Sequence, residues 1–189
     1  ISEFDGRNPR DYLVIFRSPN PVARHAGGKK IWLSCDQQTV GDFRVFASKC
    51  HETVTISPYH SQYFLDRYQI ENTHVIDIPI REWDYENVQV ERDPMQVLFC
   101  SVPDRGATEL AAVWEIVSRA VPEAKLHITS DYRLWDANIS PGVSLPFRLK
   151  FAHFNNVYYH ALVPRPELVK LQLQSSIQLY PSVYEELFC

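Results

Sequence analysis

The stretch QVLFCSVPDRGATELAAVWEIV, residues 96–117, decides the fold. It begins with a predicted strand over 96–100, in which Gln96 is followed by four apolar residues. A short loop follows, and from Gly106 onward apolar side chains lie on one helical face: Leu110, Val113, Trp114, Val117 and Val121. The stretch therefore predicts a strand, a tight connection and a helix, which together form the repeating unit of parallel α/β sheets.

The same alternation extends in both directions. Downstream, the patterns predict strands over 125–129, 157–159 and 177–180, a helix over 164–174, and an irregular loop over 130–150. Upstream, they predict strands over 12–16, 30–34, 54–56 and 74–78. Ser57 and Pro58 suit the first positions of a helix that follows the third of these strands. The expected fold class is α/β, with Rossmann-like parallel sheet layers.

The segment REWDYENVQVERD, residues 81–93, separates two such regions. It carries seven charges in thirteen positions and shows no consistent hydrophobic period. We therefore expect a linker there, between a domain over 5–80 and a second domain over 94–189. Residues 1–4 resemble the scar of an expression vector and are excluded from the fold.

Composition removes several classes of protein. The 189 residues are 45% hydrophobic and 22% charged, with a net charge of -4, which describes a globular chain without a strongly basic surface. A nucleic-acid-binding protein is therefore not expected. Only six glycines occur, and neither glycine-rich phosphate-loop pattern is present, which excludes a P-loop enzyme and a standard dinucleotide-binding protein. The four cysteines are too widely spaced for CxxC pairs and are interpreted as reduced thiols of a cytoplasmic protein.

The loop between the expected strand and Gly106 is the first candidate site. Ser101, Asp104, Arg105 and Gly106 lie between the carboxyl end of a strand and the amino end of a helix, where open α/β sheets bind ligands and where free N–H groups favour phosphate. Arg105 offers a bidentate contact to a phosphate, and Gly106 permits close backbone approach. The alternative is that Asp104 merely caps the helix while Arg105 points to solvent.

The end of the chain, YPSVYEELFC (residues 180–189), is the second candidate site. It places Ser182 and the paired carboxylates Glu185 and Glu186 after a strand, where they could contact sugar hydroxyls. The alternative is that the two carboxylates simply favour the start of a helix through its dipole. The seven histidines show neither HxH nor HExxH spacing, so no metal site is expected.

Together the two stretches resemble the carboxy-terminal domain of GT-B glycosyltransferases of the retaining family 4 type. The resemblance rests on FCSVPDRG (99–106), on VPEAKLHI (121–128) and on the run from 180 to 189, and extends more weakly to 31–80. In this comparison Arg105 and Gly106 occupy the position of the basic residue and glycine that face the donor diphosphate. Glu186 matches the first glutamate of the E-x7-E motif, whose second glutamate would lie beyond residue 189. Relatives often carry His-Asp where this chain has Cys35-Asp36.

The resemblance implies that the chain is an internal fragment of a retaining hexosyltransferase-type enzyme. Residues 5–80 would be the end of its amino-terminal, acceptor-side domain, and residues 94–189 the first part of its carboxy-terminal, donor-binding domain. The parent would transfer a sugar from a nucleotide-sugar donor to a hydroxyl of a glycan, lipid or small molecule. In this scheme Arg105 stabilises the diphosphate, Glu186 orients donor hydroxyls, and Ser101, Asp104, Gly106 and Ser182 complete the donor site. No metal or other cofactor is implied.

The 189-residue chain itself is expected to be inactive. The parent would be cytoplasmic or peripheral to a membrane. A non-catalytic nucleotide- or protein-binding module is the alternative function, and exposed sheet edges could also pair two copies of the chain.

Overall fold

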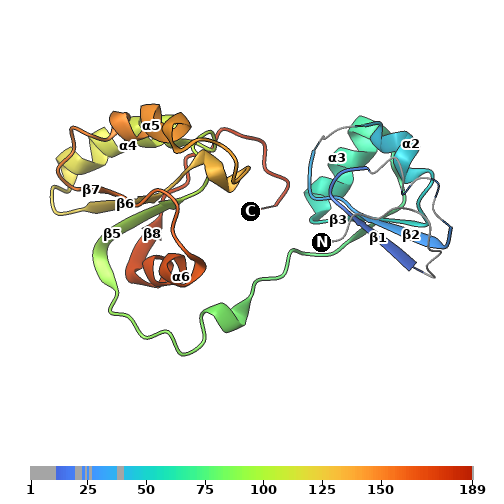
Figure 1. The fold of residues 1–189 in the computed structure, drawn as a ribbon, viewed down its shortest axis with the longest axis horizontal. Coiled ribbons are helices and arrows are strands. Elements are labelled where there is room, and N and C mark those ends of the chain that lie inside the picture. Colours follow the sequence, from blue (N-terminus) through green and yellow to red (C-terminus); the bar gives the residue numbers. More distant parts are fainter. Residues whose placement is uncertain (1–11, 20–22, 24, 26, 38–40, 189) are drawn as a thin grey trace. The chain divides into compact units, whose positions relative to one another are not determined.

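The computed structural model describes residues 12–19, 23, 25, 27–37 and 41–188. They form two compact units (Figure 1). The first unit comprises the described residues up to Ile80 together with those from Glu185 onward, and the second comprises Arg81–Tyr184. The tail from Glu185 thus groups with the first unit, although it was expected to belong with residues 94–184. The vector-like residues 1–4 lie outside the described residues.

The first unit is a parallel sheet with helices along it. Its strands are β1 (Tyr12–Phe16), β2 (Lys29–Leu33), β3 (Glu52–Thr55) and β4 (Thr73–Val75), in the order β1-β2-β3-β4. The helices whose bounds lie within the described residues of this unit are α2 (Phe43–Ala47) and α3 (Pro58–Tyr68). The Ser57 hydroxyl accepts a hydrogen bond from the His60 N–H at 2.9 Å, so Ser57 caps α3 as its sequence predicts.

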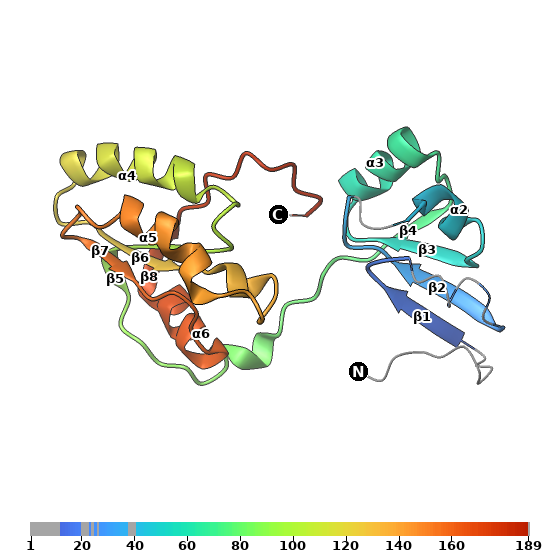
Figure 2. The same cartoon turned by 45° about the horizontal axis from the view of Figure 1, so that its top comes forward.

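Aromatic side chains fill the space between this sheet and its helices. The register pairs Ile15 with Trp32, so both side chains lie on the same face of the sheet. Trp32 is fully buried, and its ring centroid lies 4.9 Å from that of Phe43 and 5.3 Å from that of Phe46. Both helices lie over this face in Figure 2. The five residues of α2 are too few to show a helical period, which is why the sequence did not reveal this helix.

A buried histidine makes the stability of the first unit depend on pH. His60 is fully buried, and its Nδ1 accepts a hydrogen bond from the Ile56 N–H at 3.3 Å. Burial lowers the pKa of His60 from 6.5 to about 4, against an opposing effect of the Asp36 charge. Below pH 6.5 the unfolded chain therefore binds a proton that the folded unit does not bind, and stability falls as the pH falls.

We expect the first unit to lose about 2 kcal/mol of unfolding free energy between pH 7 and pH 5, which follows from about 1.4 kcal/mol per pKa unit. Urea unfolding followed by hydrogen exchange of first-unit peptides measures this loss. His60→Gln keeps a hydrogen-bond acceptor but cannot titrate, so its pH dependence should be smaller by that amount. An equal pH dependence in both proteins would contradict the assignment to His60.

The second unit is also a parallel sheet, but its strands do not lie side by side in chain order. Its strands are β5 (Asp93–Cys100), β6 (Lys125–Thr129), β7 (Val157–Tyr159) and β8 (Ser175–Gln178), in the order β7-β6-β5-β8. Helix α4 (Ala107–Ala120) connects β5 to β6, α5 (Leu145–Lys150) lies between β6 and β7, and α6 (Arg165–Gln174) precedes β8.

Helices cover both faces of this sheet. Leu110 and Trp114 of α4 pack with Phe99, Leu126 and Phe151 in one buried cluster. Helix α6 lies on the opposite face (Figure 1), where the Gln96 amide donates to the Leu171 carbonyl oxygen at 3.4 Å and to the Ser175 hydroxyl at 2.9 Å. Burial on both faces explains the uninterrupted apolar run of the central strand β5.

Several boundaries differ from the sequence prediction. The loop expected over 130–150 contains two 3-10 turns, Tyr132–Leu134 and Pro141–Ser144, and then α5. The expected linker contains a 3-10 turn, Glu82–Asp84, in which Asp84 accepts from Arg81 at 3.0 Å and from Arg165 at 2.8 Å. Strand β5 begins at Asp93, which pairs with Lys125 at 2.9 Å, and not at Gln96. The Asp84–Arg165 and Asp93–Lys125 contacts join residues 81 and 32 positions apart in the sequence, which a local pattern does not reveal.

Candidate functional site

The strand order of the second unit creates a switch point between β5 and β8. From β5 the chain adds β6 and β7 on one side, and then places β8 on the other side of β5. The loops that follow β5 and β8 therefore leave the sheet side by side at its carboxyl edge, and the Leu179 N–H donates to the Leu98 carbonyl at 2.9 Å. Open α/β sheets bind ligands in the crevice at such a point. Both stretches singled out in the sequence begin at this edge.

Gly106 allows these two loops to touch. Its φ is +103°, which L-residues rarely adopt, and a Cβ atom at this position would lie 2.6 Å from the Pro181 carbonyl oxygen and 3.0 Å from the Ser182 nitrogen. Real Cβ atoms are essentially never found that close to backbone atoms. Ser182 comes 76 residues after Gly106 in the sequence. Because Gly106 has no side chain, the backbone at Ser182 can lie next to the start of α4.

Arg105 lies between aromatic rings. The carbon at the centre of its guanidinium group is 3.5 Å from the centroid of the Tyr184 ring and 5.9 Å from that of Trp135. Stacking engages the face of the guanidinium, whereas its N–H donors lie in its plane. Tyr184 and Trp135 thus orient a group whose donors suit a phosphate. Tyr184 lies within the second candidate stretch but had no predicted role there, and Trp135 lies outside both candidate stretches. The sequence shows both aromatic residues but does not show that they meet Arg105.

Asp104 does not cap α4. Its carboxylate accepts a hydrogen bond from the Trp135 indole N–H at 3.3 Å, and Gly106 is the N-cap residue, without a side-chain cap among the described residues. The alternative in which Asp104 caps the helix is therefore not what the structure contains. Ser101 and Ser182 are half-buried, and the Ser182 hydroxyl accepts from the Tyr184 N–H at 3.1 Å.

The loop after β6 adds polar groups at the same edge of the sheet. The buried Asp131 carboxylate accepts two hydrogen bonds from the Arg133 guanidinium, each at 2.9 Å, and Arg133 lowers the pKa of that carboxyl. The neighbouring Ser130 hydroxyl is buried and has no hydrogen-bond partner among the described residues. A buried polar group of this kind usually finds a partner, which can be an ordered water molecule.

Glu186 belongs to the first unit, whereas the other predicted donor-site residues belong to the second. The tail around it is held on the first unit by three hydrogen bonds. The Tyr59 hydroxyl donates to the Glu185 carboxylate, the Ser57 hydroxyl donates to the Leu187 carbonyl, and the Gln37 amide donates to the Glu185 carbonyl at 2.5 Å. Residues 179–188 form no helix.

No metal site is found among the described residues, since no group of three His, Cys, Asp or Glu side chains lies close enough to hold an ion. Cys35, Cys50 and Cys100 are free thiols, while Cys189 lies outside the described part. No described helix has the length and apolar character that a membrane span requires.

Comparison with known proteins identifies the fold. No family model and no curated relative matches the sequence. Among solved structures, TarM is similar over 92% of this chain and 36% of its own, with a TM-score of 0.67 and 14% identity. Sucrose-phosphate synthase from Thermosynechococcus elongatus is similar over 93% of this chain and 51% of its own, with a TM-score of 0.65 and 12% identity.

A third structure is a mutant of S. aureus TarM in complex with fondaparinux, α-GlcNAc-glycerol and UDP. It has a TM-score of 0.62 and 15% identity, and the similarity covers 87% of this chain and 35% of that chain. The chain thus spans between about one third and one half of the length of these proteins. The expected fold class, α/β with Rossmann-like parallel sheets of the GT-B type, is confirmed.

Proposed function

We propose that the chain is part of a retaining glycosyltransferase that takes a sugar from a nucleotide-sugar donor. The proposal is carried by one observation: at the switch point of the second sheet, Gly106 meets the Pro181–Ser182 backbone, and the neighbouring Arg105 stacks on Tyr184. The fold is that of glycosyltransferases, and one similar structure is a complex with UDP.

Arg105 is the residue that we assign to the donor diphosphate. A guanidinium stacked on Tyr184 is fixed in orientation before a ligand arrives, so little of its conformational freedom is lost on binding. Its positive charge would offset the negative charge that develops on the leaving nucleoside diphosphate. Ser101, Asp104, Gly106 and Ser182 would line the same donor site.

Glu186 is assigned to the hydroxyls of the donor sugar. Retention, a hexosyl donor and Glu186 all come from the resemblance to family 4. The acceptor would be a hydroxyl of a glycan, lipid or small molecule, and the reaction would need no metal. We place the enzyme in the cytoplasm or at the surface of a membrane, and we expect no turnover from the 189 residues alone.

Nucleotide titration tests the assignment of Arg105. We expect the 189-residue chain to bind UDP, GDP or ADP in isothermal titration. Arg105→Ala should weaken that binding at least tenfold, since hydrogen bonds between charged groups contribute about 1.5–3 kcal/mol.

Arg119→Ala is the matched control, because Arg119 lies at the other end of α4, where it pairs with Glu115 at 2.5 Å. This variant should bind as the wild type does. The proposal fails if no nucleotide binds, or if the two variants weaken binding equally.

A further inference from the structure

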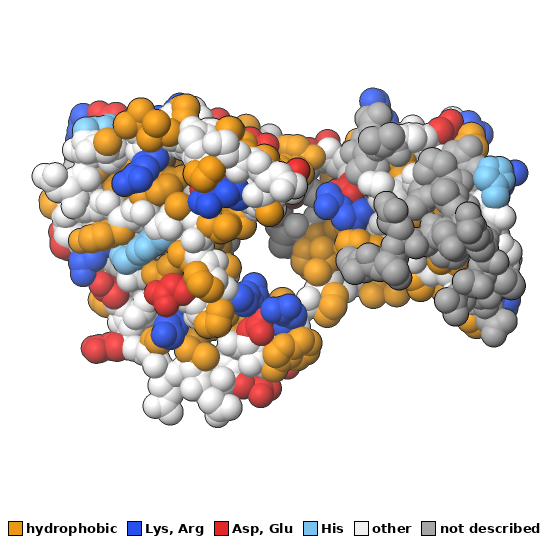
Figure 3. Space-filling view, in the orientation of Figure 1, with side chains coloured by type: hydrophobic (Ala, Val, Ile, Leu, Met, Phe, Trp, Pro, Cys, Tyr) orange, Lys and Arg blue, Asp and Glu red, His pale blue; other side chains and the backbone are white. Residues whose placement is uncertain are grey.

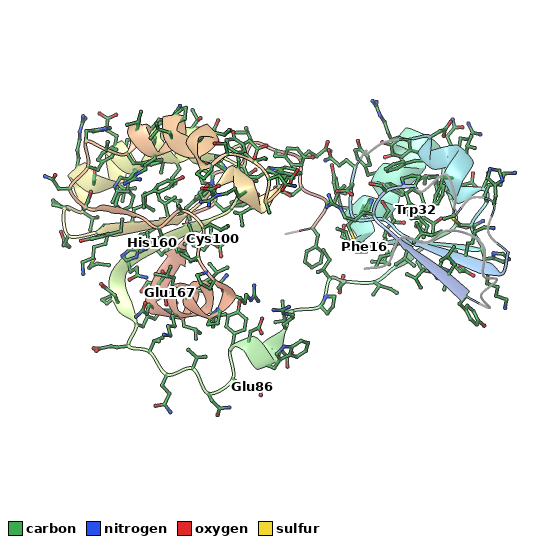
Figure 4. All side chains as sticks on the ribbon, in the orientation of Figure 1. Phe16, Trp32, Glu86, Cys100, His160 and Glu167 are labelled. Atoms are coloured by element: carbon green, nitrogen blue, oxygen red, sulfur yellow. The ribbon has the colours of Figure 1, made fainter. Side chains whose placement is uncertain are left out.

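A hollow opens at the carboxyl ends of the strands of the first unit. Its volume is about 400 Å³, within the roughly 300–1,000 Å³ of small-molecule sites. Its apolar walls come from the ends of several strands and from the residues after β4: Phe16, Leu33, Ile56, Ile76, Ile78 and Pro79. Phe16 is 62% exposed, on the face of the sheet opposite Trp32 (Figure 4). Hydrophobic side chains are likewise visible on the surface of this unit in Figure 3.

Of the charged side chains that line the hollow, one is available to bind a ligand. Arg17 and Asp36 satisfy each other through two hydrogen bonds, at 2.9 Å and 2.7 Å. Burial raises the pKa of the Cys35 thiol, so this wall stays uncharged at neutral pH. The Asp77 carboxylate also lines the hollow, and it has no hydrogen-bond or ion-pair partner among the described residues.

Asp77 also lines a second hollow, of about 340 Å³, within the same unit. The other walls of this second hollow are the start of α3, at Ser57 and Tyr59, and the tail that carries Glu186. The apolar hollow and the hollow of Glu186 therefore share Asp77 as a common wall.

We propose that the apolar hollow binds the hydrophobic part of the sugar acceptor, with a hydroxyl-bearing end at Asp77 facing Glu186. The acceptor is accordingly an amphiphile, with an alkyl, isoprenoid or ring system attached to its hydroxyl group, and not a purely polar glycan. This assignment of acceptor class rests on the proposed function. The net charge of the lining is one negative unit, which disfavours an anionic ligand.

A chain-length series measures the apolar contribution. Alkyl β-glucosides are titrated below their micelle concentrations as competitors of diphenylhexatriene, a fluorescent hydrocarbon without polar atoms. Each buried methylene contributes roughly fourfold in affinity, so octyl glucoside should bind roughly fifteenfold more tightly than hexyl glucoside. Glucose alone should not displace the probe. Equal affinity across the series would overturn the proposal.

Matched variants locate the binding. Ile78 lines the hollow and is 45% exposed, whereas Ile80, two residues away, is 74% exposed and lies outside it. Ile78→Ser should weaken binding of both the probe and octyl glucoside about tenfold, and Ile80→Ser should change neither more than twofold. Asp77→Ala should weaken octyl glucoside severalfold and leave the probe unaffected. Equal losses in both isoleucine variants would indicate nonspecific binding and refute the site.

Two further measurements separate the proposal from its competitors. Light scattering of the free chain should give a monomer. A dimer that dissociates when octyl glucoside binds would instead mean that a second copy of the chain covers this surface. Nucleotide binding in the second unit uses none of these residues. Chain-length-dependent binding without any nucleotide binding would therefore keep the hollow as a site but overturn its assignment to an acceptor.

Discussion

Gly106→Ala should destabilise the second unit by about 3 kcal/mol, of which roughly 1–2 comes from the left-handed backbone and the rest from overpacking. The φ of +103° is unfavourable for alanine, and the new methyl group would meet the Pro181 carbonyl oxygen at 2.6 Å. The contact is with backbone, so no side-chain rotation relieves it. Relief requires the loop after β8 to move away from the start of α4, which would also disrupt the Arg105 site.

Hydrogen exchange in urea, followed by mass spectrometry, measures this loss of unfolding free energy in peptides of the second unit. Gly142→Ala is the control within the same unit, because its nearest neighbour outside the adjacent residues is the Ser140 hydroxyl at 3.8 Å, without a positive φ. It should change stability by much less. Comparable losses in the two variants would show that the loops do not pack as described.

Trp32→Ala should cost the first unit about 3–5 kcal/mol, the usual range for removing a buried large aromatic side chain. Trp32 is fully buried, and its indole N–H donates to the Arg17 carbonyl at 2.8 Å. The substitution leaves a cavity between β2 and its helices and an unsatisfied carbonyl beside the apolar hollow. Because the second unit has its own core around Trp114, its exchange protection should be nearly unchanged.

Trp114→Ala is the reciprocal experiment. Trp114 is also fully buried, and its indole N–H donates to Asn156 at 3.4 Å. It should destabilise second-unit peptides by a similar amount and spare the first unit. If either variant unfolds both units together, the two cores are not independent.

Strands and helices whose formation depends only on residues close together in the sequence could be predicted from the sequence. The strands over 125–129 and 157–159 have the expected bounds, because burial of alternating or continuous apolar side chains is readable within five residues. Ser57 followed by Pro58 marked the start of α3, because capping depends only on neighbouring residues. Short helices such as α5 carry too few periodic positions to be recognised.

Only part of the candidate site could be predicted from the sequence, because local patterns reveal only what neighbouring residues determine. Arg105 and Gly106 stood out because a strand, a loop and a helix follow one another there. Their contacts with Tyr184 and Trp135 depend on how β8 and the loop after β6 return to β5, which no local pattern encodes. The partners of Glu185 on α3 were equally invisible, since 126 residues separate it from Tyr59.

Those last contacts have a consequence for synthesis on the ribosome. Ser57 and Leu187 are 130 residues apart. At about 5–20 residues per second, the tail therefore emerges roughly 7–26 s after the start of α3. During that interval the sheet β1-β2-β3-β4 can form while Ser57 and Tyr59 still lack their tail partners. The first unit thus begins folding first on the ribosome but can complete its contacts only after the second unit has been translated.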